Sequence, residues 1–150
     1  MRNKNRTAAI DWFIQRDWEL AITLTFKKDC TEHRARKTMR RLWNGIDRQL
    51  YHKAFKKQRK RVERVCAFEK GQSGTHYHYH IATSPPPKDL DISFDKYRLM
   101  IAKEWDKLSS AVYIKKFQSI YDNEGWAKYI TKEITTTNTD AIDEVTTHLN

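Results

Sequence analysis

The sequence predicts an α+β domain in which helices pack on an antiparallel β-sheet, as in ferredoxin-like folds. Segments rich in β-branched and aromatic residues alternate with segments that carry apolar residues at helical spacing. Two neighbouring strands are joined by a glycine-containing turn at 71–74, which is typical of a hairpin. After a short leading helix, the order is strand, helix, strand, strand, helix, strand, helix. This order favours one antiparallel sheet that is covered on one face.

The composition indicates one packed domain. Hydrophobic residues make up 39% of the 150 residues, with only four glycines and three prolines. We expect a single domain over 1–150, with its core at about 8–134 and a frayed or weakly helical tail at 135–150. No apolar run has the length of a membrane span and the N-terminus lacks a signal-peptide core, so we expect a cytoplasmic protein without membrane contact. Cys30 and Cys66 are interpreted as reduced thiols.

The first half of the chain predicts a short helix, a buried strand and a long amphipathic helix. Residues 1–6 are interpreted as a loose tail and 8–16 as the short helix. Leu20–Phe26 is rich in β-forming residues and predicts a mostly buried strand. Thr31 is a candidate N-cap for the long helix. Its inner stripe recurs at spacings of three and four: Met39, Leu42, Trp43, Ile46 and Leu50.

The second half predicts a hairpin followed by two helices and a strand. The hairpin strands are expected at 62–69 and 75–83, and the prolines at 85–87 end the second strand. The remaining elements are a helix at 94–108 capped by Ser93, a strand at 111–121, a turn at 122–125 and a helix at 125–134.

The formal net charge of +10 is concentrated in one block. Residues 27–64 hold 15 Lys and Arg against 4 Asp and Glu, which favours a polyanionic partner such as nucleic acid. A solvated surface gives the same composition, and residues 53–64 fit a charged loop as well as they fit a DNA contact. We expect DNA contacts from Lys27, Lys28, Arg34, Lys37, Arg41 and Lys128.

Three histidines alternate with tyrosine and isoleucine in the second hairpin strand. Because alternate side chains of a strand share a face, His76, His78 and His80 should line one face. Such a face can offer several imidazoles to a divalent metal ion, although a half-buried strand with a polar outer face is the alternative. Glu69 ends the first hairpin strand, which should bring it close to His76 or His78.

A carboxylate with two imidazoles predicts a metal site with open positions. These ligands suit Mn²⁺ or Mg²⁺, or a transition metal that acts as a Lewis acid. Structural zinc is disfavoured because no cysteine completes the ligand set. His78 and His80 are the preferred pair because Ile81 and Ala82 continue the strand into the sheet. His76 fits a rim residue nearly as well as it fits a ligand.

The segment at 125–132, Gly-Trp-Ala-Lys-Tyr-Ile-Thr-Lys, carries a second kind of chemistry. On a helix, Tyr129 and Lys132 are three residues apart and share a face. A lysine beside a tyrosine can lower the pKa of the phenol, or it can neutralise a phosphate that the tyrosine attacks. Such pairs are common by chance, but beside a metal-binding hairpin in a basic protein this one is informative.

Three segments together resemble the motifs of the HUH endonucleases, which include rolling-circle replication initiators and relaxases. Ile22-Thr-Leu-Thr-Phe26 resembles the first motif, a strand that flanks the site. His78-Tyr-His80 resembles the His-hydrophobic-His motif, and Tyr129-Ile-Thr-Lys132 resembles the nucleophile helix. The resemblance spans roughly residues 20–134, which is nearly the whole chain.

The resemblance implies an HUH-type nuclease that nicks and rejoins single-stranded DNA at a replication origin. It implies Tyr129 as the nucleophile, Lys132 as a supporting cation, and His78, His80 and Glu69 as metal ligands. The products would be a 5′-phosphotyrosine and a free 3′-OH. It also implies an initiator of rolling-circle replication, encoded by a plasmid or virus of a bacterial or archaeal cell, that works with a host helicase and polymerase.

Several alternatives stay open. His76 and His78 also form a His-hydrophobic-His pair, so the register of the ligand pair is not fixed. Gly125 stands four residues before Tyr129, so we expect a one-tyrosine enzyme, with Tyr121 interpreted as a core or strand-end aromatic. A single-tyrosine transposase or relaxase shares all these residues. A non-catalytic nucleic-acid-binding module would instead stack bases on Tyr77, Tyr79 and Trp126.

Overall fold

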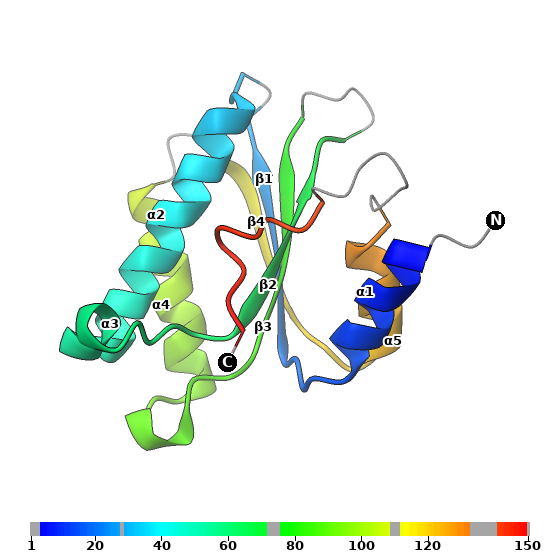
Figure 1. Cartoon of the computed structure of the whole chain (residues 1–150). Coiled ribbons are helices and arrows are strands. Elements are labelled where there is room, and N and C mark those ends of the chain that lie inside the picture. The colour runs from blue at the N-terminus through cyan, green and yellow to red at the C-terminus, as the bar shows by residue number, and fades with distance from the viewer. Residues whose placement is uncertain (1–3, 28, 72–75, 109–111, 133–140, 150) are drawn as a thin grey trace.

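The computed structural model describes residues 4–27, 29–71, 76–108, 112–132 and 141–149, with the backbone alone over 112–117. Figure 1 shows the arrangement of its helices and strands. In chain order they are α1 (Lys4–Ile14), β1 (Leu20–Phe26), α2 (Glu32–Tyr51), α3 (Lys53–Lys57), β2 (Arg64–Glu69), β3 (His78–Thr83), the 3₁₀ helix η1 (Lys88–Leu90), α4 (Phe94–Lys107), β4 (Val112–Ser119) and α5 (Asn123–Ile130).

The strands form one antiparallel sheet in the order β2-β3-β1-β4. The central strand β1 pairs with β3 on one side and with β4 on the other. The elements β1-α2-β2-β3-α4-β4 follow the βαββαβ order of ferredoxin-like folds. The predicted class, an α+β protein with helices packed on an antiparallel sheet, is confirmed.

Helices cover both faces of the sheet, whereas the element order predicted cover on one face. On one face, α2 and α4 pack over Leu20, Ile22 and Leu24 of β1 and enclose the larger core (Figure 1). On the other face, α1 and α5 form a smaller cluster over Ala67 and Ala82. Because these strand residues are small, the two helices can lie close to the sheet. This second face also carries the polar residues described below.

Side-chain caps begin three of the helices. The hydroxyl of Thr31 accepts a hydrogen bond from the backbone N–H of Arg34 at 3.2 Å, and Ser93 caps α4 in the same way. The carboxylate of Asp122 accepts from the N–H of Gly125 at 2.9 Å at the start of α5. Each cap satisfies an N–H that has no partner within its helix. The predicted caps at Thr31 and Ser93 are confirmed, and so is the burial of the predicted α2 stripe.

Two predicted helix boundaries are wrong. α1 begins at Lys4, where a loose tail was predicted, and the guanidinium of Arg6 donates a hydrogen bond to the carbonyl of Lys128 at 2.9 Å. α5 ends at Ile130, short of the predicted end, and the last two residues of the predicted helix lie outside the described residues. Long-range contacts of this kind leave no local signal in the sequence.

Residues 141–149 pack against the edge strand β2, although a frayed or weakly helical tail was predicted at 135–150. Arg64 and His148 exchange two backbone hydrogen bonds of 2.7 and 2.9 Å. The N–H of Phe68 donates to the carbonyl of Ala141 at 2.6 Å. The segment thereby covers hydrogen-bonding groups of an edge that would otherwise be open to pairing with another chain. The first six residues of the predicted tail, 135–140, lie outside the described residues.

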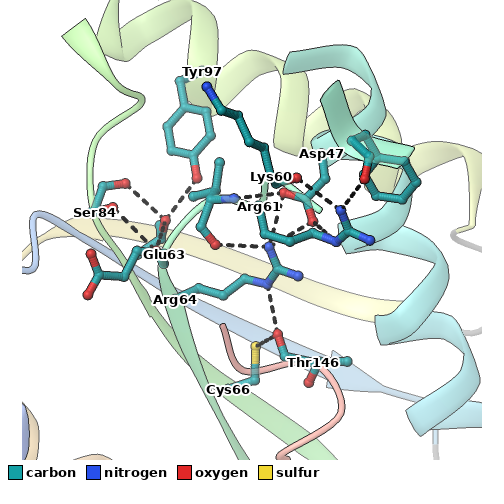
Figure 2. A network of polar contacts seen from close by, with 12 residues as sticks. Asp47, Lys60, Arg61, Glu63, Arg64, Cys66, Ser84, Tyr97 and Thr146 are labelled. Carbon is teal, nitrogen blue, oxygen red and sulfur yellow. Dashed lines mark hydrogen bonds and ion pairs between the residues drawn. The ribbon is translucent and has the colours of Figure 1, made fainter. Parts of the chain in front are cut away.

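A buried ion pair fastens α2, β2 and this C-terminal segment together (Figure 2). The Nη1 atom of Arg64 donates to both carboxylate oxygens of Asp47, at 3.1 and 2.9 Å. Its Nε atom donates to the carbonyl of Thr146 at 2.7 Å. The backbone N–H of Val62 also donates to Asp47 at 2.9 Å. These contacts satisfy two charged side chains that are 0% and 4% exposed.

Both cysteines are buried free thiols, in agreement with the prediction. Burial raises the pKa of the Cys66 thiol to about 12, so it is not a thiolate at neutral pH. In the ranges described, no helix combines the length and the apolar character needed to cross a membrane.

Candidate active site

Two of the three histidines project from β3 on the face of the sheet that carries α1 and α5. The antiparallel register places His80 opposite Thr23 and His78 opposite Thr25. In each pair the threonine hydroxyl contacts the imidazole Nδ1 atom, at 3.3 Å for His80 and 3.0 Å for His78. Two hydroxyls of β1 therefore fix the orientation of both rings, as partners of metal-binding histidines do.

Glu69, the last residue of β2, joins the pair from the other side. Its backbone partner in the ladder is His78, which agrees with the prediction, but its side chain reaches across to His80. The Glu69 Oε2 atom lies 2.8 Å from the His80 Nε2 atom. The same oxygen lies 3.1 Å from the Nζ atom of Lys132. One carboxylate oxygen therefore connects the histidine strand to the lysine that follows α5.

His76 precedes β3 and does not extend the row of His78 and His80. Its Nε2 atom is 3.0 Å from the carbonyl oxygen of Phe26, and its ring packs against that of His78 with centroids 4.7 Å apart. Gly71 adopts a φ of +70°, and a Cβ atom there would lie 2.8 Å from the carbonyl oxygen of His76. The turn at Gly71 ends the paired region at Glu69 and His78. The prediction of three histidines on one strand face is therefore wrong for His76.

α5 places the ring of Tyr129 beside this cluster. The centroid of that ring is 4.8 Å from the centroid of His80, in an edge-on arrangement of 71°. Trp126 contacts Tyr129 with a centroid distance of 5.3 Å. Tyr129 nevertheless remains 42% exposed. Its ring is held by aromatic neighbours, while a substrate can still reach it from solvent.

Lys132 lies in a turn after α5, although the sequence predicted that it lies within the helix. Its backbone N–H donates to the carbonyl of Tyr129 at 3.3 Å. The Nζ atom lies 4.5 Å from the centroid of the Tyr129 ring. The predicted contact between Tyr129 and Lys132 is therefore present, and the same ammonium group also reaches Glu69.

Neutral imidazoles and an ionised carboxylate are the stable forms of this cluster at neutral pH. Burial lowers the pKa of His80, against the opposing effect of Glu69. Burial and the nearby His76 lower the pKa of His78. Burial acts to raise the pKa of Glu69, but hydrogen bonds from His80 and Lys132 outweigh it and bring that pKa below its ordinary value. Neutral His80 therefore donates its Nε2–H to the Glu69 carboxylate, and its Nδ1 accepts from a hydroxyl.

The donor atoms fit a divalent metal ion in kind and, for one pair, in spacing. Two ligands at about 2.1 Å from an octahedral metal and at right angles to each other are about 3 Å apart. The 2.8 Å between the Nε2 atom of His80 and the Oε2 atom of Glu69 is close to this value. In the part of the chain that the structure describes, no three His, Cys, Asp or Glu side chains form a complete metal cluster. A metal held by three ligands would therefore require His78 to move toward the other two.

The cations predicted to contact DNA are not gathered around the cluster. Those that the structure describes are all exposed: Lys27, Arg34, Lys37, Arg41 and Lys128. α2, which carries three of them, lies on the opposite side of the sheet from His80 (Figure 1). Lys128 lies on α5 and pairs with Glu124 at 2.7 Å. Lys28 lies outside the described residues. DNA contact by these cations stays a prediction.

The sequence analysis missed the two threonines that orient the imidazoles. The signal was present in Ile22-Thr-Leu-Thr-Phe26, because a period of two places both hydroxyls on one face of β1. The same period places Leu24 on the opposite face, in the larger core. Only the pairing of β1 with β3 shows that the two hydroxyls meet two imidazoles.

The fold and the cluster define a class of protein, an α+β domain with two imidazoles, a carboxylate, a lysine and a tyrosine on one sheet face. The model of the replication-associated protein ORF2 family matches residues 19–138, and the chain belongs to that family. The matched region runs from β1 to beyond α5, so it includes every residue of the cluster. No curated protein and no solved structure matches the chain significantly. Membership makes this a replication-associated protein, which is consistent with the initiation of rolling-circle replication.

Proposed function

We propose that the protein is an HUH-type endonuclease that nicks and rejoins single-stranded DNA to initiate rolling-circle replication. The observation that carries this proposal is the position of Tyr129. Its half-exposed ring lies 4.8 Å from that of His80, and Lys132 contacts both Tyr129 and Glu69. A nucleophile, a cation and candidate metal ligands on one open surface suit the transfer of a phosphoryl group.

In the proposed reaction the hydroxyl of Tyr129 attacks a phosphorus atom of the DNA backbone. A bond forms between the tyrosine oxygen and phosphorus, and the bond between phosphorus and the 3′ oxygen breaks. The tyrosine proton is lost, and the leaving 3′ oxygen takes up a proton to become a free 3′-OH. Lys132 would neutralise charge on the phosphate, because its Nζ atom lies within 4.5 Å of the ring. Attack by the released 3′-OH on the phosphotyrosine would reverse the step and rejoin the strand.

His78, His80 and Glu69 would hold the divalent metal, with Mn²⁺ or Mg²⁺ as the proposed cofactor. When bound, such an ion supplies Lewis-acid polarisation of a phosphate oxygen. Thr23 and Thr25 orient the two imidazoles, and a threonine hydroxyl can accept a hydrogen bond as well as donate one. His80 can therefore move its proton to Nδ1 and leave Nε2 free as a ligand. His76 is not required by this assignment, because its Nε2 atom already faces a carbonyl oxygen.

Single-stranded DNA at a replication origin is the proposed substrate. The exposed surface of Tyr129 and the partly exposed Trp126 are adjacent, and such a pair of rings can stack unpaired bases. The free 3′-OH would serve as a primer for a host polymerase, and a host helicase would separate the strands. These partners follow from the proposed reaction.

The proposal is tested by locating a covalent bond between the protein and DNA. We expect incubation with single-stranded oligonucleotides tiled across the DNA that flanks the gene, in the presence of Mn²⁺, to give an adduct that survives boiling in detergent. Mass spectrometry of the digested adduct should place a 5′-phosphonucleotide on the peptide that contains Tyr129. The proposal fails if no oligonucleotide gives an adduct, if the modified residue is another one, or if EDTA leaves the yield unchanged.

Metal binding has a test of its own that does not depend on catalysis. Replacing Glu69 with glutamine should weaken Mn²⁺ binding at least about tenfold, because an amide is a poorer ligand than a carboxylate for a hard cation. Titration calorimetry or the loss of the free Mn²⁺ paramagnetic signal would measure it. Glu124→Gln is the matched control, because Glu124 is exposed and pairs with Lys128 on α5. Equal affinity in the Glu69 variant and the wild-type protein would remove Glu69 from the ligand set.

A further inference from the structure

A group of cations beyond the C-terminal end of α2 has no role in the candidate active site. Residues 48–62 include seven Lys and Arg and no Asp or Glu. Five of these cations are exposed on or directly after α3, and we call them the distal basic platform: Lys53, Lys56, Lys57, Arg59 and Lys60. Within the described ranges, no carboxylate forms an ion pair with any of the five. Their charge is therefore available to a partner.

The platform is attached to the core by specific contacts. Phe55 is buried, and the guanidinium carbon of Arg61 lies 3.7 Å from the centroid of its ring. Arg61 also donates to the carbonyl of Phe55 at 2.9 Å and pairs with the buried Asp47 at 3.7 Å (Figure 2). Arg48 lies on the same ring at 5.4 Å. Of the two interpretations of residues 53–64, these contacts favour a fixed cationic surface over a charged loop without partners.

The platform and the candidate active site lie at opposite ends of α2. Glu32, the first residue of α2, pairs at 3.6 Å with Lys70, the neighbour of Glu69. A helix of 20 residues is about 30 Å long, and α3 follows its last turn. Figure 1 shows α3 at the end of the molecule away from the β2–β3 hairpin. About 30 Å corresponds to about nine base pairs of duplex DNA, which rises 3.4 Å per pair.

We propose that the distal basic platform binds the phosphate backbone of duplex DNA, about nine base pairs from the strand that enters the candidate active site. The platform offers positive charge without an aromatic surface. Within residues 48–62, Phe55 is buried and Tyr51 is partly buried, so no ring is exposed for stacking on an unpaired base. Closely spaced cations without stacking groups suit the regular phosphate rows of a duplex. This inference goes beyond the proposed function, because it concerns a second surface and requires no nicking.

The test measures how strongly duplex binding depends on salt. The probe is a fluorescent 20-base-pair blunt DNA duplex, and EDTA is present so that nicking does not contribute. We expect Lys56→Ala with Lys57→Ala to make the plot of log affinity against log salt concentration shallower by about two units, since each phosphate contact contributes about 0.9. Lys53→Gln with Lys60→Gln should give the same change, and this second variant does not alter α3 at the same positions. Thermal unfolding would confirm that each variant is folded.

The matched control removes the same charge from another exposed helix. Lys96→Ala with Lys103→Ala changes two exposed lysines of α4 and should leave the slope unchanged. The inference is overturned if the slope is unaffected in the platform variants, or if the control loses as much. It is also overturned if an RNA duplex or a single strand binds the platform more tightly than the DNA duplex. Duplex binding through the platform by a protein that never forms a DNA adduct would keep this inference and refute the proposed function.

Discussion

Replacing Tyr129 with phenylalanine is expected to abolish the covalent DNA adduct and to reduce nicking by roughly 10⁴-fold or more. The substitution removes only the hydroxyl that would attack phosphorus. The phenyl ring keeps its contacts with His80 and Trp126 and its place under the Lys132 ammonium group. The fold and DNA affinity should therefore change little. Denaturing gels of the adduct and single-turnover nicking rates measure the effect, while fluorescence anisotropy measures DNA binding separately.

Tyr121→Phe provides the matched control for this experiment. The sequence predicted Tyr121 in the core or at a strand end, but its side chain is 95% exposed just before α5. It is therefore accessible to DNA in the same way as Tyr129 but lacks neighbouring imidazoles in the structure. We expect wild-type yields of adduct from this variant. Loss of the adduct in Tyr121→Phe, together with its retention in Tyr129→Phe, would assign the nucleophile to the wrong end of α5 in our proposal.

Much of the fold could be predicted because its signals are local. Leu20–Phe26 begins and ends as a strand at the predicted residues, since its β-formers are bounded by polar residues on both sides. α2 begins after the predicted cap, because Thr31 and the apolar stripe lie within one continuous segment. The packing of residues 141–149 on β2 could not be predicted. It depends on backbone pairing between Arg64 and His148, which lie far apart in the chain and carry no pattern that joins them.

The candidate site divides in the same way. His78, His80, Tyr129 and Lys132 stand in short patterns, and the structure brings all four to one surface. The contact of Glu69 with His80 instead depends on how a side chain reaches diagonally across two strands. His76 follows the same alternation as His78 in the sequence, but the turn at Gly71 interrupts the strand before it. Periodicity predicts a shared face only while the backbone remains extended.

The largest expected effect on stability is at Asp47, on the other side of the sheet from Tyr129. Asp47→Ala would leave the guanidinium of Arg64 buried without its carboxylate, and it would also remove the acceptor for the N–H of Val62. Removing one partner of a buried ion pair costs about 3–5 kcal/mol, because the remaining charge stays desolvated. We expect the free energy of unfolding to fall by this amount and the urea midpoint to fall by more than about 1 M.

Asp95→Ala is the control, because the Asp95 side chain is 93% exposed and lies 4.0 Å from its partner Arg98. Its loss should cost less than about 1 kcal/mol. Asp47→Asn keeps an acceptor of the same shape and should lie between the two. A cost below about 1 kcal/mol for Asp47→Ala would mean that water or another group replaces the carboxylate beside Arg64.

The Asp47 variants also separate the stability of the protein from its proposed chemistry. Arg64 holds both Asp47 and the carbonyl of Thr146, so weakening it loosens α2 and the C-terminal segment together. Tyr129, His80 and Glu69 lie on the opposite face and make no contact with this pair. At temperatures where Asp47→Ala is folded, we therefore expect it to form the DNA adduct at the wild-type rate, whereas Tyr129→Phe is folded and inactive. A folded Asp47 variant without adduct would show that the buried pair positions the active site through the sheet.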